Sequence, residues 1–255
     1  MNVSAIVLTH NSKDLIDECL KSLLWVKEVI VVDDNSSDST KESVSRYAKA
    51  IFVEGKHSFS DNRNIGARKA RGGWLLYVDD DERVTPELKK EIEKIGTDYC
   101  AYAIPRKNYI FKKEFKHSGQ YPDYVKRVFE KENFIKWMGE LHEEPEFKGK
   151  LGHLRSPLIH KKHDNLSDMV TKTNEWSEIE AKLMFNESHP PMTWWRFFSV
   201  MFREFWLRMI KQVAFLDGTE GVIYAIYQVF SRSVSYAKLW ELQLEDKKRN
   251  IKQDI

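Results

Sequence analysis

The sequence predicts an α/β protein, with a mixed, mainly parallel sheet flanked by helices and a helical C-terminal region. Two observations support this prediction. Up to Val78, short apolar runs alternate with stretches that have apolar residues at helical spacing, which is typical of right-handed βαβ units. From Leu166 onward, helical spacing continues almost to the C-terminus. We therefore expect a catalytic or binding domain over residues 1–165 and a helical region over 166–255 that either associates with a membrane or oligomerises.

The N-terminal elements follow in order. Val3–Leu8 is a continuous apolar run, as expected for a strand that is buried on both faces of a parallel sheet. Asn11 or Ser12 is the predicted cap of the helix that follows. The same pattern then predicts strands over residues 29–32, 51–54 and 74–78, a helix from about Thr40 and another over residues 61–70.

The residue pattern changes after Tyr99. Between Tyr99 and His160 the segments YCAYAIP, NYIF, YVKRVFE and FIKW are short and alternating, which predicts an antiparallel or mixed extension of the sheet. Beyond them, the spacing predicts helices over residues 166–185, 191–212 and 219–244.

Composition excludes several classes of protein. The chain has 255 residues, of which 42% are hydrophobic, enough for a substantial core. Its 41 basic and 39 acidic side chains nearly cancel, so charge gives no reason to expect a nucleic acid partner. Cys19 and Cys100 are expected to be buried free thiols in a reducing compartment. With neither a secretory signal nor a long apolar span, the chain is expected to be soluble or peripheral to a membrane.

The stretch YVDDDERV, residues 77–84, concentrates negative charge behind a predicted strand. Four adjacent carboxylates repel one another, so they are expected to need open water or a cation. Asp79 and Asp81 are two residues apart and can direct oxygens to one point, and such hard ligands suit Mg²⁺ or Mn²⁺. The alternative is a solvated acidic turn before a helix that starts at Thr85-Pro86.

Two further loops belong with this one. Thr9–Asn11, Asp33–Ser36 and Asp79–Glu82 each follow a predicted strand, and ligands of parallel sheets bind beyond the carboxyl ends of the strands. The segment FSDNRNIGARKARGGW adds several cations, of which Arg63 opens a predicted helix and can reach a phosphate or a base. The three loops are therefore expected to line one crevice.

The run VSAIVLTHNS, VVDDNSSDST and DNRNIGARKARGGWLLYVDDDE resembles the nucleotide-sugar-binding half of family 2 glycosyltransferases, which have the GT-A fold. The stretches LHEEPEF and SPLIHKKH resemble more narrowly the lipopolysaccharide-core β-1,4-glucosyltransferase type. The resemblance is closest over residues 1–85, with shorter stretches at 137–163 and at FLDGTEG, 215–221.

The resemblance implies a metal-dependent, inverting transfer of a sugar from a nucleoside-diphosphate sugar, most often a UDP-sugar. The implied acceptor is a glycan or a lipid-linked molecule of cell-envelope polysaccharide or lipopolysaccharide synthesis. By position, the resemblance assigns the base and ribose to Thr9 and Asp33, the rest of the donor to Asn11, Asp34, Arg63, Asp79 and Asp80, and Mn²⁺ or Mg²⁺ to Asp79, Asp81 and His160.

The general base is the least determined role. Inversion by direct displacement needs a base to take the proton of the acceptor hydroxyl, and Glu143, in the pair His142-Glu143, is the candidate. Glu140 and Glu144 remain alternatives because the sequence here reads LHEEPE. Both His142 and His160 can instead be hydrogen-bonded structural histidines.

The predicted helix over 191–212 is unusually aromatic. At 100° per residue its broad apolar face carries Trp194, Trp195, Phe198, Met201, Phe202, Phe205, Trp206 and Met209, while Arg196, Arg203, Arg208 and Lys211 lie on or beside the other face. This pattern suits an anionic membrane surface, and equally suits packing on the catalytic domain or on another subunit. The resemblance favours peripheral attachment to the cytoplasmic face of the cell membrane. The last helix, with Val222, Ile226, Val229, Phe230, Ala237 and Trp240 near one face, can pack against the aromatic helix in a homo-oligomer.

Two other functions compete with a glycosyltransferase. A sugar nucleotidyltransferase usually grips phosphate with a glycine-rich loop after the first strand, whereas THNSK contains no glycine. A non-catalytic sugar- or lipid-binding scaffold would not need the complete acidic cluster.

Overall fold

The structure is a computed structural model that describes residues 2–47, 50–55, 58–139 and 143–253. The chain divides into two compact units. Unit 1 comprises Met1–Asn108 and Pro122–Lys162, and unit 2 comprises Tyr109–Tyr121 and His163–Ile255. The helical unit therefore takes in a segment, residues 109–121, that precedes the expected division at 165/166.

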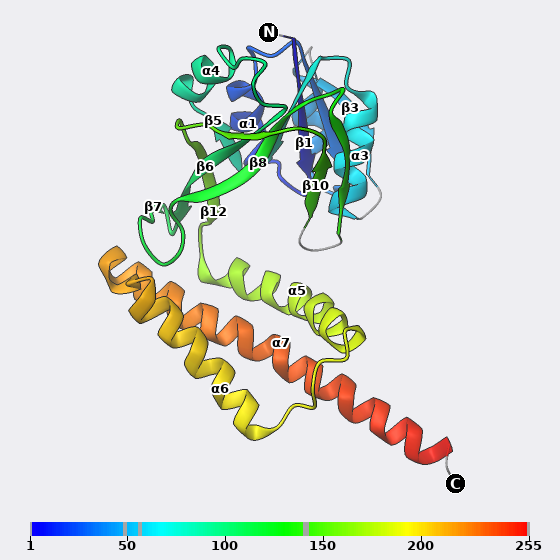
Figure 1. The fold of residues 1–255 in the computed structure, drawn as a ribbon, viewed down its shortest axis with the longest axis vertical. Helices are drawn as coiled ribbons and strands as arrows, with labels where there is room; N and C mark the ends of the chain where they lie inside the picture. Colours follow the sequence, from blue (N-terminus) through cyan, green and yellow to red (C-terminus); the bar gives the residue numbers. More distant parts are fainter. Residues whose placement is uncertain (1, 48–49, 56–57, 140–142, 254–255) are drawn as a thin grey trace. The chain divides into compact units, whose positions relative to one another are not determined.

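The main sheet begins with parallel strands in the order β3 (Ala50–Glu54), β2 (Glu28–Asp33), β1 (Val3–Thr9) and β4 (Trp74–Asp79), of which β1 and β3 are labelled in Figure 1. It continues from β4 through β8 (Asp123–Glu130), β6 (Ala101–Ile110), β12 (Leu158–His163) and β5 (Glu82–Val84), with β11 (Leu151–His153) and β7 (Lys113–Glu114) also pairing with β6. Strand β8 is antiparallel to both β4 and β6. The mixed, mainly parallel sheet predicted from the sequence is therefore confirmed.

Within the described residues of unit 1, four helices flank this sheet: α1 (Ile16–Ser22), α2 (Thr40–Ser45), α3 (Phe59–Lys69) and α4 (Pro86–Ile92). Side chains alternate across β1, so that Val3, Ala5 and Val7 join one apolar cluster while Ile6 and Leu8 join another. The first cluster includes residues of α1 and α4, and the second includes residues of α3. Burial on both faces explains why β1 is an uninterrupted apolar run.

A separate two-stranded sheet consists of β9 (Phe134–Met138) and β10 (Glu144–Phe147), which are antiparallel. Asn64 on α3 fixes β9 to the main core. Its side-chain Oδ1 accepts from the Trp137 N–H at 2.8 Å, and its Nδ2 donates to the Trp137 carbonyl at 3.0 Å. The side-chain amide of Asn64 thus satisfies both the N–H and the carbonyl of Trp137, as the backbone of an adjacent strand would.

The predicted cap of the first helix is wrong. Helix α1 begins at Ile16, and neither Asn11 nor Ser12 caps it with a side chain. Asn11 has a left-handed backbone with φ of 50°, and its Oδ1 accepts from the Ser37 N–H at 2.8 Å. That hydrogen bond links the loops after β1 and β2, so Asn11 connects these two loops and does not cap the helix. By contrast, the predicted start of α4 is confirmed, because Thr85 Oγ1 accepts from the Leu88 N–H at 3.1 Å.

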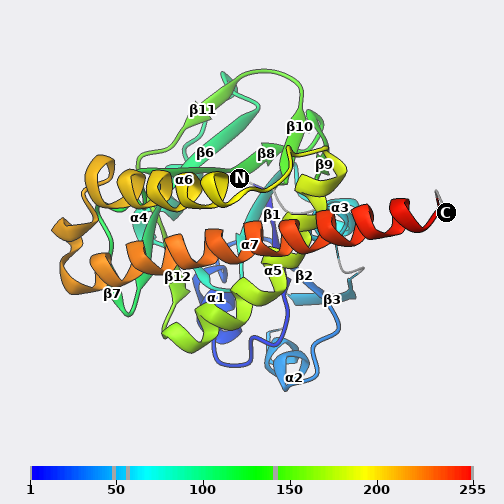
Figure 2. The ribbon, with the colours of Figure 1, turned by 90° about the horizontal axis from the view of Figure 1, so that it is seen from below.

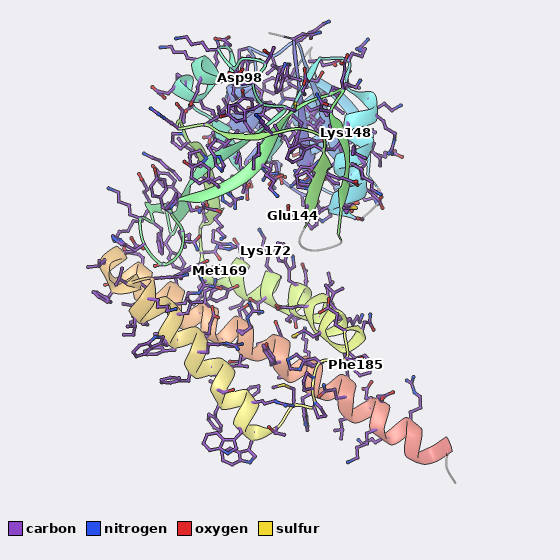
Figure 3. All side chains as sticks on the ribbon, in the orientation of Figure 1. Asp98, Glu144, Lys148, Met169, Lys172 and Phe185 are labelled. Carbon is purple, nitrogen blue, oxygen red and sulfur yellow. The ribbon has the colours of Figure 1, made fainter. Side chains whose placement is uncertain are left out.

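Unit 2 is built on α7 (Gly218–Gln253), which packs against α5 (Leu166–Asn186) and α6 (Trp194–Phe205). Figure 1 and Figure 2 both show α6 lying along α7. Helix α6 continues as a π-helical segment, Trp206–Lys211, and a 3₁₀ turn, Ala214–Asp217, leads into α7. Met169 and Phe185, labelled near the two ends of α5 in Figure 3, belong to two separate apolar clusters of this unit.

A buried carboxylate fastens the start of α7 to residues 113–118. Asp217, only 4% exposed, accepts from the backbone N–H groups of Lys116 and His117 at 3.0 Å and from Ser118 Oγ at 2.9 Å. The chain then turns at Gly218, whose φ of 76° favours glycine. The FLDGTEG stretch therefore has a structural role in unit 2.

The packed face of α7 differs from the predicted one. Of the six predicted residues, Ile226, Phe230 and Trp240 are 57%, 46% and 49% exposed, while Val222, Val229 and Ala237 are partly buried. Among the side chains that the structure describes, the buried residues of α7 are Gly221, Tyr224, Ala225, Tyr227, Ser235, Tyr236 and Leu239. Helices α5 and α6 both pack on α7, and the side of α7 that they cover together cannot be identified from the spacing of its hydrophobic residues. Cys19 is a buried free thiol, as predicted, whereas the free thiol of Cys100 is only partly buried.

Candidate active site

The register of the sheet brings the three predicted loops together. Thr9 lies opposite Asp33 across β1 and β2, and Leu8 lies opposite Asp79 across β1 and β4. The Asp34 N–H donates to the Thr9 carbonyl at 2.9 Å, which extends the first pairing beyond the strands. Thr9, Asp33 and Asp79 therefore stand at the carboxyl ends of adjacent strands, where parallel sheets bind ligands.

Asp33 holds its own loop. Its Oδ2 accepts from the Ser36 N–H at 2.9 Å and its Oδ1 accepts from Ser36 Oγ at 2.5 Å. Asn35 between them has a φ of 55°, and the Asp34 carbonyl accepts from a His10 ring nitrogen, Nδ1, at 2.6 Å. The loop is thus ordered by hydrogen bonds among its own residues, with Asp33 at its base.

Asp79 is held by two arginines. Its Oδ1 accepts from Arg63 Nη2 at 3.0 Å, and its Oδ2 accepts from Arg127 Nη2. Burial alone would raise the pKa of this carboxyl, but the charges of Arg127 and Arg63 outweigh burial and hold the pKa well below its usual range. Asp79 is therefore an ionised carboxylate whose two oxygens both face guanidinium groups.

Glu82 is the most buried acid of the YVDDDERV stretch, with no solvent exposure. Its Oε2 accepts from the Asp79 N–H at 3.0 Å, and its Oε1 accepts from Arg127 at 3.1 Å and from Arg106 at 3.3 Å. The cation that Glu82 was expected to need is therefore supplied by the side chains of Arg106 on β6 and Arg127 on β8, and not by a metal.

Asp80 points to the opposite loop. The hydroxyl of Ser12 donates to Asp80 Oδ2. Burial and the neighbouring charge of Asp81 raise the pKa of Asp80 to about 6, although the bond from Ser12 works in the other direction. Asp80 thus connects the loop after β4 to the loop after β1.

A chain of hydrogen bonds orients His160 toward Asp81. Arg106 donates to Asp123 Oδ2 at 2.6 Å, and the amide nitrogen of Asn108 donates to the same oxygen at 3.0 Å. The amide oxygen of Asn108 must then accept from His160 Nδ1, at 2.5 Å. The proton of a neutral His160 is therefore on Nδ1, and the lone pair of Nε2 points to Asp81 Oδ2, 3.4 Å away.

This pair fits a divalent cation. Two acceptors that face each other are stabilised by a positive charge between them. The carboxylate suits Mg²⁺ or Mn²⁺, and the imidazole nitrogen favours Mn²⁺, because Mg²⁺ prefers oxygen ligands. A ligating histidine characteristically donates its other ring N–H to an oxygen, as His160 does to Asn108. No cluster of three or more His, Cys, Asp or Glu side chains suited to a metal occurs among the described residues. A cation at Asp81 and His160 would therefore keep several positions for water or substrate oxygens.

Glu143 faces the same cluster. Its Oε1 lies 3.6 Å from Arg63 Nε, and the Arg63 guanidinium lies over the Trp137 ring, 4.9 Å from its centroid. Glu144, labelled in Figure 3, is exposed and pairs with Lys126 at 2.6 Å. Glu140 and His142 lie outside the described residues. Of the two described candidates for a base, Glu143 is the one directed at the Asp79 cluster.

Three buried arginine nitrogens have no hydrogen-bond partner among the described residues. They are Nη1 of Arg63, Nε of Arg127, and Nε of Arg63, which lies 3.6 Å from Glu143 Oε1; both side chains are 6% exposed. A buried N–H that is left unpaired costs about 1–3 kcal/mol, so such donors are suited to an anionic ligand. Guanidinium groups are well matched to phosphate oxygens.

Sequence reasoning missed four polar residues of this cluster: Arg106, Asn108, Asp123 and Arg127. All four lie on β6 and β8, which pair with Arg106 opposite Asp123. A local signal existed at Arg127, which alternates in phase with the buried Phe129 on β8. An arginine on the buried side of a strand requires an acidic partner.

The mixed sheet, its flanking helices and the acidic residues at the carboxyl ends of the parallel strands have the arrangement of the GT-A fold. The chain belongs to the family described as Glycosyl transferase family 2, because the sequence model of that family matches residues 4–148.

Three comparisons illustrate the relationship. The chain is 24% identical over 278 residues to an uncharacterized glycosyltransferase of Rickettsia bellii, covering 99% of this chain and 91% of the relative. It is 27% identical over 115 residues to the putative teichuronic acid biosynthesis glycosyltransferase TuaG of Bacillus subtilis, covering 40% of this chain and 45% of TuaG. The fold is similar to that of the mannosyltransferase PcManGT from Pyrobaculum calidifontis, solved with GDP-Man and Mn²⁺. That similarity has a TM-score of 0.53 with 14% identity, over 94% of this chain and 87% of PcManGT.

Proposed function

We propose that this glycosyltransferase is metal-dependent and inverting, and that its donor is a nucleoside-diphosphate sugar. The observation that carries the proposal is that the two arginines paired with Asp79 keep unpaired buried N–H groups, while Asp81 of the same loop faces His160 in a way that suits a cation. A diphosphate is the part of such a donor that needs both cationic donors and a metal. The family resemblance favours UDP as the nucleotide, whereas the solved relative PcManGT was bound to GDP-Man.

Asp81 and His160 are the residues proposed to hold Mn²⁺ or Mg²⁺. When bound, the cation would supply Lewis-acid stabilisation of the negative charge on the departing diphosphate. Asn108 and Asp123 orient His160, because their hydrogen bonds place the ring proton on Nδ1 and leave the lone pair of Nε2 for the cation.

The donor is proposed to lie across the carboxyl ends of β1, β2 and β4. Thr9 and Asp33 would face its base and ribose, with Asn11 and Asp34 ordering the two loops around them. Asp79 was expected to contact both sugar and metal. Because its oxygens face Arg63 and Arg127, we assign it to orienting these two arginines and to the sugar, and leave the metal to Asp81 and His160.

Glu143 is the proposed general base. It would accept the proton of the acceptor hydroxyl as that oxygen bonds to the anomeric carbon and the nucleoside diphosphate leaves from the opposite side. Arg63 lies 3.6 Å from the carboxylate and can direct it, while the Asp79 contact fixes Arg63 in turn. Arg63 would therefore serve two purposes, since it lies beside the proposed base and also offers unpaired N–H groups to the diphosphate.

The acceptor is proposed to be a glycan or a lipid-linked molecule of the cell envelope, with the protein peripheral on the cytoplasmic face of the membrane. Teichuronic acid synthesis in the name of TuaG and the LHEEPEF and SPLIHKKH stretches support envelope polysaccharides. The narrower identity, a lipopolysaccharide-core β-1,4-glucosyltransferase, is a proposal from those two stretches alone.

The decisive experiment measures release of nucleoside diphosphate from a panel of UDP- and GDP-sugars, with Mn²⁺, with Mg²⁺ and with a chelator. We expect turnover of one donor that requires the metal. Asp81→Asn and His160→Gln should each lower metal-dependent turnover by at least about a hundredfold without unfolding the protein. Asp98→Asn, which alters an exposed acid labelled in Figure 3, is the control and should keep full activity.

Two outcomes would reject the proposal. A protein that binds no sugar nucleotide would be a scaffold of this fold. Full turnover in the presence of chelator, or in Asp81→Asn, would remove the metal from the mechanism. Glu143→Gln should keep donor binding and lose transfer, so an active variant would place the base elsewhere.

A further inference from the structure

The apolar face of α6 that the sequence predicts points away from the core of unit 2. Exposure is 66% for Trp194, Trp195 and Phe202, 58% for Phe198, 48% for Trp206 and Ile210, and 43% for Phe205. We call these seven residues the aromatic face. The side of α6 that packs inward carries instead Val200 and Glu204, which are 7% and 8% exposed. Seven large apolar side chains on one face of one segment are more than scattered surface exposure produces.

The aromatic face is ordered by its own contacts. The Trp194 and Trp195 rings stack with centroids 4.5 Å apart, and the Phe202 and Trp206 rings stack at 6.3 Å. Trp194 and Phe198 meet edge to face at 6.4 Å. The exposed rings therefore form a continuous apolar surface and not a set of separate side chains.

Charge along this segment has one sign. Between residues 188 and 216 the sequence contains a single acid, Glu204, and it is buried and paired with Arg208 at 2.7 Å. Arg196, Arg203 and Lys211 are exposed. At 100° per residue, Arg196 and Arg203 fall at 200° and 180° from Trp194, next to the edge of the aromatic face, which extends to Trp206 at 120°. Cationic side chains therefore border the apolar surface with no exposed carboxylate among them.

We propose that the aromatic face, with Arg196, Arg203 and Lys211, binds the surface of an anionic phospholipid bilayer. An apolar stripe at the level of the headgroups with lysine and arginine beside it is the composition of an interfacial helix. No described helix is long and apolar enough to span a membrane, so the contact is with the surface. Lysine and arginine stems can lie along the apolar stripe while their charged ends reach lipid phosphates.

A second copy of the chain fits this face less well. A symmetric dimer apposes the same patch of two copies, which would bring the cations of one copy toward the cations of the other, with no exposed acid of residues 188–216 to offset them. An anionic bilayer supplies the missing negative charge and accepts rings of any orientation.

An apolar cavity at the start of α6 is a second feature that suits a lipid partner. It has a volume of about 390 Å³ and is lined by Met192, Thr193, Trp194, Phe197, Phe198, Ala237 and Trp240. Its volume is in the range of small-molecule sites, roughly 300–1,000 Å³, and its lining is almost wholly apolar. Two of its lining residues, Trp194 and Phe198, belong to the aromatic face, so an acyl chain that enters the cavity starts from the docked surface.

The inference is independent of catalysis and is tested by co-sedimentation of the full chain with vesicles. We compare vesicles of phosphatidylcholine alone with vesicles of equal parts phosphatidylcholine and phosphatidylglycerol. Each lysine or arginine near an anionic surface strengthens binding by roughly fivefold. With three exposed cations, we expect about a hundredfold tighter binding to the anionic vesicles, and weaker binding as salt is added.

Two variants separate the apolar and the charged contributions. Trp195→Ser with Phe202→Ser should weaken binding to anionic vesicles at least tenfold, and Arg196→Glu with Arg203→Glu should do the same with every ring in place. All four residues are exposed, so circular dichroism and thermal unfolding should be unchanged. Trp176→Ser on α5 is the control, because Trp176 is 49% exposed and lies outside this segment.

Three results would overturn the proposal. They are absence of binding to anionic vesicles, binding that Trp176→Ser reduces as much as the Trp195/Phe202 variant does, and equal binding to neutral and anionic vesicles. A dimer by light scattering that Trp195→Ser with Phe202→Ser converts to a monomer, with no vesicle binding, would assign the aromatic face to a second copy of the chain.

Discussion

Arg127 should be the residue on which the acidic cluster of unit 1 depends most. Its guanidinium is 6% exposed and contacts Asp79 and the fully buried Glu82. Four carboxylates, those of Asp79, Glu82, Asp123 and Glu143, are ion-paired with three arginines, the others being Arg63 and Arg106. Without Arg127 the four negative charges would share only two arginines, so the charge balance of the cluster depends on it.

Arg127→Met keeps much of the side-chain volume and removes the charge. Breaking a buried ion pair by removing one partner typically costs 3–5 kcal/mol. Asp79 retains Arg63 at 3.0 Å and Glu82 retains Arg106 at 3.3 Å, so we expect the lower end, a loss of about 3 kcal/mol in the free energy of unfolding of unit 1. Urea unfolding combined with amide exchange of β4 and β8 measures this loss without assuming that the two units unfold together.

A second variant tests the electrostatic reason. In Arg127→Met with Glu82→Gln one negative charge is removed as well, and we expect recovery of about 1–2 kcal/mol relative to the sum of the single changes. Arg68→Met, at an exposed position of α3, is the control and should change stability by less than about 0.5 kcal/mol. A loss below about 1 kcal/mol for Arg127→Met, or additive effects in the double variant, would refute the charge-balance argument.

Two further substitutions test packing in each unit. Gly221→Ala in α7 would place a methyl group 2.0 Å from the Ala214 carbonyl oxygen, so unit 2 should lose about 2–3 kcal/mol in urea unfolding, whereas Gly73→Ala, with open space around it, should have little effect; equal effects would contradict the clash. Asn64→Ala removes both side-chain bonds to the Trp137 backbone, so the Trp137 amide should lose about 1–3 kcal/mol of protection in hydrogen exchange, and undiminished protection would show that β9 is held by other contacts.

The strand ends of the site could be predicted because the signals are local. Each of β1, β2 and β4 is an apolar run followed at once by polar residues, and parallel strands bring such ends together whatever the details of packing. The arginines could not be placed in this way. Arg127 reaches the cluster because β8 pairs antiparallel with β4, and Arg106 because β6 pairs antiparallel with the other side of β8. The β4–β8 pairing joins residues some 50 positions apart in the sequence, such as Leu76 and Val128.

The YVDDDERV stretch illustrates the difference. Its charge can be read from the sequence, but the partner of each acid cannot. Asp79 and Glu82 face arginines, Asp80 faces Ser12, and Asp81 faces His160. The four neighbours separate because a strand end and a short strand, β5, direct successive side chains to different sides.

By itself, the sequence determined the α/β class, the order of the strands along the chain, the three polar loops and the aromatic stripe of α6. These depend on periodicity and on residue type, which are properties of short segments. Only the tertiary structure decided which acids are neutralised by arginine, which ring nitrogen His160 presents to Asp81, and that the aromatic stripe faces outward while Val200 and Glu204 face inward. Those outcomes depend on contacts between distant segments, where burial forces each charge to find a partner and the packing of α7 decides which side of α6 is covered.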